Sequence, residues 1–199
     1  VRCHPNHFGL ATKRHDRIKH LLFALLKDTL VANETILPTA DDALEIVVQQ
    51  ATANTREIKA DIVVFTNPAR QNQARYIFDV AIVEPTNQHG RSAVSGRIRD
   101  RGAAAAHKEK AKFDTYRPVA NSDASAIIIP FVLESNGFVG TEASKFLTSL
   151  VDKGHSGTKK RIQSFLAEVS YGLAKDTGWA ATRARIEAVA HSLAPPPAE

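Results

Sequence analysis

The chain has 199 residues, 43% of them hydrophobic and 24% charged, which is enough for one compact domain and excludes a disordered chain. Its formal net charge of +5 favours an anionic partner, and its single cysteine excludes an internal disulfide framework. No run of about 18 apolar residues and no signal-peptide pattern is present, so we expect a soluble intracellular protein without a membrane partner. Because methionine is absent even at position 1, we expect part of a longer protein or a processed product.

The first half of the sequence predicts one helix followed by three strands. Residues 11–33 carry leucine and isoleucine at helical spacing, with basic residues near the start. Residues 43–52, 56–65 and 74–84 are rich in β-branched side chains and are separated by short polar turns. These three segments predict an antiparallel meander.

A basic loop, a helix and a buried strand are predicted next. Residues 86–102 contain glycine and arginine and are long enough for a functional loop. The alanine-rich residues 103–117 predict a helix. Residues 125–135 are nearly all apolar and predict a buried strand, which Pro130 makes irregular or places at an edge.

The last third of the sequence predicts helices only. Residues 141–151 form one helix, and residues 155–193 form one or two, broken or kinked near Gly178. The order helix, three-strand meander, helix, strand and extra C-terminal helices predicts a mixed α/β (α+β) fold with one sheet. It differs from the alternating βαβ order of nucleotide-binding folds.

Two aspartates interrupt the apolar strands. Asp61 lies in "IKADIVVF" and Asp79 in "RYIFDVAIV", and a buried carboxylate is unfavourable without a partner or a metal. On adjacent antiparallel strands, the two carboxylates could share one Mg²⁺ or Mn²⁺ that is completed by water and phosphate. The alternative is a structural role, in which each aspartate accepts hydrogen bonds from loop amides.

Three lysines follow on the helix predicted at 103–117. Lys108 and Lys112 are one turn apart and share a face, from which a lysine could neutralise charge on a phosphate, and Lys110 lies between them. A solvated face of an alanine-rich helix is the alternative interpretation.

The order of these segments resembles the PD-(D/E)XK nuclease superfamily. More narrowly, it resembles the restriction-enzyme-like endonuclease domain of site-specific non-LTR retrotransposon proteins. The resemblance rests on "ADIVVF", "FDVAIVEP", "AHKEKAKFD" and "IIIPFVLESNGFVGTEASKFL". Ala60 replaces the proline of the motif, and Ala81 stands where the usual lysine would be.

The resemblance therefore implies a catalytic lysine on the following helix. Lys112, in the "KFD" context, is the first candidate and Lys108 the second. Asp61 and Asp79 would hold the metal, with Glu45 as an additional ligand.

The implied activity is that of a Mg²⁺- or Mn²⁺-dependent DNA endonuclease in the nucleus. It would nick double-stranded DNA to prime a reverse transcriptase located upstream in the same polypeptide. The implied domains are a zinc-knuckle remnant and linker at 1–10, a nuclease core at 11–154, a C-terminal helical extension at 155–193 and a tail at 194–199.

The N-terminal residues also resemble these proteins, in which a zinc knuckle ends about a dozen residues before an arginine–histidine pair. Cys3 and the pair Arg14–His15 stand in those places. Cys3 would be the last ligand of an incomplete site, so Zn²⁺ is expected only if upstream knuckle residues are present.

The basic loop and the helix after it are candidate DNA-binding segments, although a solvated loop is the alternative. An arginine-rich loop beside the site could follow a phosphate backbone. The candidate residues are Arg91, Arg97, Arg99, Arg101 and Lys110.

Two other functions stay open. One is a catalytically inactive nucleic-acid-binding module with the nuclease fold. The other is an interaction domain whose aspartates are structural.

Overall fold

Two β-sheets and the helices packed around them form the structure, a computed structural model that describes residues 6–29, 34–37, 46–50, 56–66, 74–84, 102–152 and 157–192. Its helices in these ranges are α1 (Asn6–Thr29), α3 (Ala103–Ser122), α4 (Thr141–Asp152) and α5 (Thr158–Ser192). The expected mixed α+β class is confirmed.

The main sheet has four strands in the order β1-β4-β5-β6. Its members are β1 (Glu34–Leu37), β4 (Ile62–Thr66), β5 (Arg75–Val83) and β6 (Ala126–Glu134). β4 pairs antiparallel with both β1 and β5, whereas β5 and β6 are parallel. A separate two-stranded antiparallel sheet joins β2 (Ile46–Gln49) to β3 (Ile58–Ala60).

The prediction of one sheet with a meander of 43–52, 56–65 and 74–84 is therefore wrong in part. The segment at 56–65 divides at Asp61 into β3 and β4, which belong to different sheets. Among the described residues, β2 pairs with β3 alone, and β1 takes the place expected for the first strand. Sheet membership depends on long-range hydrogen bonds, which the local apolar pattern does not report.

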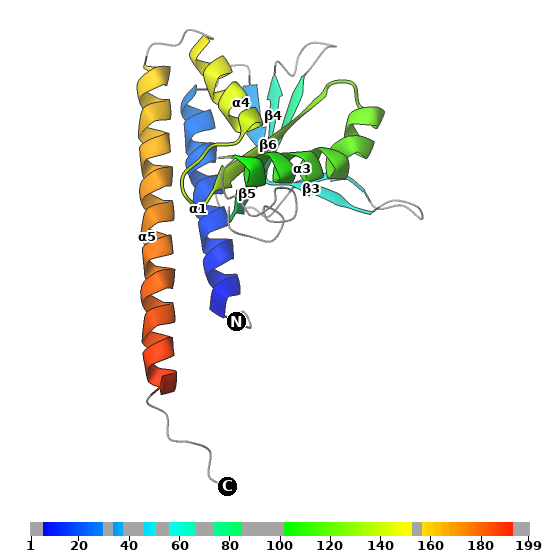
Figure 1. The fold of residues 1–199 in the computed structure, drawn as a ribbon. Coiled ribbons are helices and arrows are strands. Elements are labelled where there is room, and N and C mark those ends of the chain that lie inside the picture. Colours follow the sequence, from blue (N-terminus) through cyan, green and yellow to red (C-terminus); the bar gives the residue numbers. More distant parts are fainter. Residues whose placement is uncertain are drawn as a thin grey trace.

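The main sheet lies between two layers of helices (Figure 1). Alternate residues of β5 point to opposite faces, as its sequence predicts. Phe78 and Val80 join the core under α1, α4 and α5, whereas Ile77 packs with residues of α3. Asp79 is an odd-numbered residue like Ile77 and faces the α3 side.

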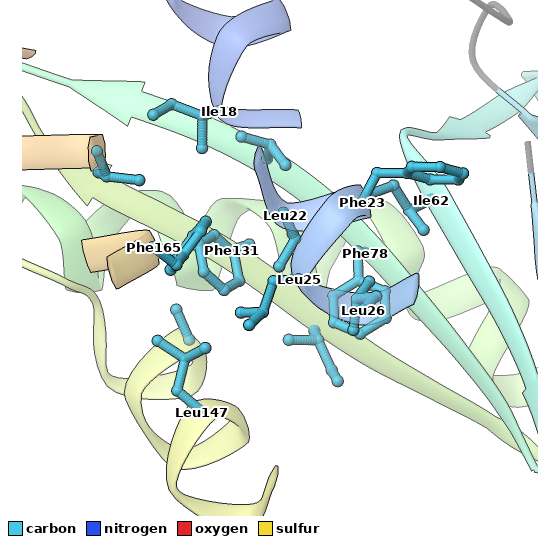
Figure 2. Packing of buried hydrophobic residues seen from close by; sticks show 14 of the residues in the cluster. Ile18, Leu22, Phe23, Leu25, Leu26, Ile62, Phe78, Phe131, Leu147 and Phe165 are labelled. Carbon is cyan, nitrogen blue, oxygen red and sulfur yellow. The ribbon is translucent and has the colours of Figure 1, made fainter. Parts of the chain in front are cut away.

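The larger core consists of aliphatic and aromatic side chains from α1, α4, α5 and the sheet (Figure 2). Leu22 and Leu26 of α1 are fully buried in it, and Phe165 of α5 meets the ring of Phe131 edge-on at 6.0 Å. Burial of such side chains is the main stabilising contribution. The first half of α5 thus shares its core with α1 and the sheet.

The helix predicted at 11–33 is present, but its boundaries are wrong. α1 begins at Asn6 and ends at Thr29, whose hydroxyl donates to the Leu25 carbonyl at 2.7 Å. The apolar period marks only the buried part of a helix, and α1 continues beyond it on the N-terminal side, where residues 11–13 are exposed.

The later helices show two further differences from the sequence-based boundaries. α3 continues past residue 117, through Pro118 to Ser122. Its last turn is stabilised because Val119 is buried with Ile77 in a smaller core between α3 and the sheets. α5 is one helix, without the break expected near Gly178, since a single glycine weakens a helix without ending it.

The strand at 126–134 and the helix at 141–152 confirm their predictions, and β6 is an edge strand. Across the described ranges, every helix is too short or too polar to cross a membrane.

Candidate functional site: two buried aspartates and a lysine

Asp61 occupies the bend between β3 and β4. Its backbone N–H donates to the Phe78 carbonyl at 3.0 Å, which extends the pairing of β4 with β5 by one residue. The side chain is only 3% exposed. Its Oδ2 accepts hydrogen bonds from the Val80 N–H at 2.7 Å and from His15 Nε2 at 3.2 Å.

Asp79 lies in the middle of β5, in register with Pro130 of β6. It is 8% exposed, and Lys112 Nζ donates to its two carboxylate oxygens at 2.6 and 2.7 Å. Tyr116, one turn further along α3, donates its hydroxyl proton to the Lys59 carbonyl and lies close enough to Asp79 to favour the ionised carboxylate.

The inward face of α3 explains why Lys112 is the lysine that reaches this site. The buried positions of α3 are Ala105, Glu109, Tyr116 and Val119. Lys112 completes their spacing of three and four residues, so its ammonium group points toward the sheet. Lys108 is half-buried and Lys110 is exposed, and neither forms an ion pair or hydrogen bond with a residue of the described ranges.

The two aspartates influence each other electrostatically. Burial raises the pKa of the Asp79 carboxyl above its usual value, Lys112 and Tyr116 partly offset this effect, and the nearby Asp61 carboxylate adds to it. When two ionised carboxylates repel each other, a cation that binds between them is stabilised, because it relieves this repulsion.

His15 approaches the site from α1, on the other side of the sheet from α3. Its hydrogen bond with Asp61 is the largest cause of a rise in its pKa from 6.5 to about 9, against the opposing effect of burial. The ring is therefore protonated at neutral pH and can donate from both nitrogens. Sequence patterns did not predict this contact, because it joins residues 46 positions apart.

Tyr116 was also not identified from the sequence. Its spacing of four residues from Lys112 on one helix was the signal that could have found it.

The residue before His15 fixes the position of α1. The Arg14 side chain is only 12% exposed, and its guanidinium lies 3.3 Å from Glu84 Oε1 and 3.9 Å from Asp176 Oδ2. Glu84 directly follows β5, and Asp176 belongs to α5. Arg14 thus connects α1 to the sheet and to α5 immediately beside the site.

Two other buried carboxylates have a different environment. Glu134 caps the preceding helix: its Oε1 accepts the Ala105 N–H in the first turn of α3 at 3.3 Å. Glu109 accepts the Glu142 N–H in the first turn of α4 at 2.9 Å.

Several candidate residues from the sequence lie outside the described residues. They are Cys3, Glu45, Arg91, Arg97, Arg99 and Arg101.

Among the described residues, the arrangement offers a hard cation two ligands, Asp61 and Asp79. Asp61 Oδ1 accepts no hydrogen bond within the described ranges, and Asp79 offers two oxygens that Lys112 now neutralises. In the part of the chain that the structure describes, no group of three His, Cys, Asp or Glu side chains could bind a metal. Two carboxylates suffice for Mg²⁺, which keeps several waters and takes further ligands from phosphate.

Comparison with known proteins assigns no family, since no protein-family model and no curated protein matches the chain.

Proposed function

We propose that the chain is a metal-dependent DNA endonuclease of the PD-(D/E)XK type. The observation that carries the proposal is the meeting of Asp61, Asp79 and Lys112, all buried or half-buried, at the junction of β4, β5 and α3. Two carboxylates can bind a divalent cation that activates water and stabilises charge on a phosphate, and a lysine can stabilise part of that charge.

The order and pairing of the elements support the proposal. In the main sheet, α1 precedes the three strands β1, β4 and β5, and α3 then leads to the parallel strand β6. Asp79 lies in β5, and Asp61 directly precedes β4. Ala81 lies two residues after Asp79, where the superfamily resemblance expects a lysine. Lys112 reaches the same carboxylate from α3 and so supplies the missing ammonium group.

The donor set fits Mg²⁺ or Mn²⁺. Both are hard cations that prefer carboxylate oxygens, and the mutual repulsion of Asp61 and Asp79 is the kind of charge that such an ion relieves. When bound, the ion would lower the pKa of a ligating water and stabilise negative charge on the phosphate.

The protein's own groups have separate roles in this proposal. Asp61 and Asp79 bind and orient, while Lys112 moves from Asp79 toward the scissile phosphate as its charge develops. Tyr116 keeps the position of Asp79 defined while Lys112 moves. Substrate approach is favoured by the net charge of +5, and the arginines at 91–101 together with Lys110 remain the candidate backbone contacts.

The resemblance extends the proposal to retrotransposition. The substrate would be double-stranded DNA in the nucleus, nicked to leave a 3′-hydroxyl that primes a reverse transcriptase upstream in the same polypeptide.

A second candidate is an inactive nucleic-acid-binding module, and one observation favours it. Lys112 neutralises both oxygens of Asp79 at 2.6 and 2.7 Å, so a closed ion pair already occupies the place of the cation. A binding module keeps that pair closed, whereas a nuclease opens it.

Nicking of supercoiled plasmid separates the two functions. We expect the chain to convert supercoiled plasmid into open circles in Mg²⁺ or Mn²⁺, and to lose this activity in EDTA and in Asp79→Ala. Plasmid retention without nicking in either metal would contradict the nuclease and support the binding module. Loss of retention at high salt would identify a backbone contact in either case.

A further inference from the structure

The Asp61 carboxylate is held by one of its two oxygens. Oδ2 accepts the Val80 N–H at 2.7 Å and the His15 ring at 3.2 Å, whereas Oδ1 has no hydrogen-bond partner within the described ranges. A carboxylate with one donor can still rotate about its last torsion, which is broad for aspartate. A second donor on the same oxygen, arriving from another direction, fixes that rotation.

The His15 ring is itself held from both ends. Its Nδ1 lies 3.3 Å from Asp16 Oδ1, opposite the nitrogen that meets Asp61. The helix that carries it is anchored on one side of His15 by Arg14, which contacts Glu84, and on the other by Ile18, which is buried in the core. The direction of the Nε2–H bond is therefore set by the fold.

We infer that His15 is a positioning residue of the site: its Nε2, together with the Val80 amide, holds Oδ2 of Asp61 and thereby presents Oδ1 to a divalent cation. The inference rests on the proposed function for the cation, but its geometric part concerns the metal-free protein.

The expected size of the effect follows from other metal sites. Groups that hydrogen-bond a metal-ligating side chain typically change metal affinity by about 10- to 100-fold when they are removed. His15 belongs to this kind of group because it touches Asp61 and is not itself required as a ligand. A merely structural histidine would change stability without a specific effect on the cation.

Three substitutions separate the hydrogen bond from the shape of the side chain. His15→Gln keeps an N–H donor near the position of Nε2, His15→Asn keeps one only near Nδ1, and His15→Leu keeps none. His20→Gln, at an exposed position on the same helix, is the matched control.

The first measurement is Mn²⁺ binding to the whole chain by isothermal titration calorimetry. We expect binding about 10-fold weaker in His15→Leu and His15→Asn, with His15→Gln and His20→Gln close to the native chain. Equal or tighter Mn²⁺ binding by His15→Leu would overturn the inference. Tighter binding would mean that the charged His15 ring competes with Mn²⁺ for Asp61.

The second measurement needs neither metal nor activity. In the metal-free protein, we expect the Val80 amide to shift its proton resonance upfield and to exchange about 10-fold faster in His15→Leu, and to recover in His15→Gln. The Asp61 amide, which donates to Phe78, reports any general loosening of the strands and should stay unchanged.

The two measurements distinguish the possible failures. An unchanged Val80 amide in His15→Leu overturns the positioning role itself. Absence of Mn²⁺ binding by the native chain overturns the proposed function and the cation part of this inference, whatever the Val80 amide does.

Discussion

Two pairs of buried carboxylates lie on or beside α3, and their partners differ in kind. Glu134 and Glu109, 1% and 6% exposed, accept hydrogen bonds from backbone N–H groups in the first turns of α3 and α4. Asp61 and Asp79 are as well buried but meet the cationic side chains of His15 and Lys112.

The difference indicates which pair can change its partners. A backbone amide cannot leave a helix terminus without unfolding it, so the glutamates are fixed structural caps. The Lys112 side chain can rotate away, and a divalent cation can take its place beside Asp79, while His15 keeps its contact with Asp61. Burial of a carboxylate alone therefore does not mark a candidate site, and Asp79 differs from the two glutamates in having a side-chain cation as its partner.

The largest expected effect is a difference in the rate of plasmid nicking between a substituted aspartate and a substituted glutamate. Asp79→Asn should lower the rate of plasmid nicking by at least about 100-fold, because the cation loses a charged ligand. Glu134→Gln should keep the rate within about threefold, since the neutral amide still accepts the Ala105 N–H. Both rates are measured at saturating Mg²⁺ on protein whose folding is checked by circular dichroism. A comparable loss in both variants would place the glutamates in the site and remove the distinction.

The next effect compares two lysines on α3. Lys112→Gln should lower nicking by about 10- to 100-fold, because the ammonium group that contacts Asp79 is lost. Lys108→Gln changes the same charge one turn earlier and should remain within about threefold of the native rate. The reverse order would mean that Lys112 serves only as the counter-ion of Asp79 and that Lys108 moves toward the phosphate.

Substitution of Glu134 should lower the free energy of unfolding more than substitution of Asp79, which is the reverse of their expected effects on activity. Glu134→Ala leaves the buried Ala105 N–H without its acceptor and removes the partner of the exposed Asn136 amide, and should destabilise the protein by about 1–3 kcal/mol. Asp79→Ala should cost about 1 kcal/mol or less, because removal of one carboxylate also relieves its repulsion with Asp61. Urea unfolding with a common m-value gives both differences. A larger loss in Asp79→Ala would make Asp79 primarily structural.

The sequence predicts the parts of this site that depend on local periodicity. The alternation of β5 places Asp79 on the face opposite Phe78, and the spacing of α3 places Lys112 with Tyr116 on one side. The resemblance to known nucleases ranked Lys112 before Lys108 as the catalytic candidate, and Lys112 is the lysine that contacts Asp79; its role stays a prediction.

The remaining features are long-range and have no local signal. β1 is four residues long and is recognised only by its pairing with β4. The contact of His15 with Asp61 and that of Glu134 with Ala105 span 46 and 29 residues. Each depends on how helices dock on the sheet, which periodicity within one element cannot report.

The smallest expected effect is the pH dependence of stability, and it tests the nature of the partners directly. The pKa of His15 is raised from 6.5 to about 9 by Asp61. Because the folded-state pKa exceeds the unfolded one, the contact contributes its full stability below pH 6.5, and this contribution declines to nothing as the pH rises through about 9.

His15→Gln should therefore be less stable than the native chain by about 1–2 kcal/mol near pH 6, and the difference should disappear near pH 10. Urea unfolding across this window measures the difference, and His20→Gln controls for loss of a histidine as such. The corresponding difference for Glu134→Gln should stay flat, since its partners, a backbone N–H and an asparagine amide, do not titrate. A His15→Gln difference that grows with pH would mean that the histidine is neutral beside Asp61, and the partners of Asp61 would then be neutral like those of Glu134.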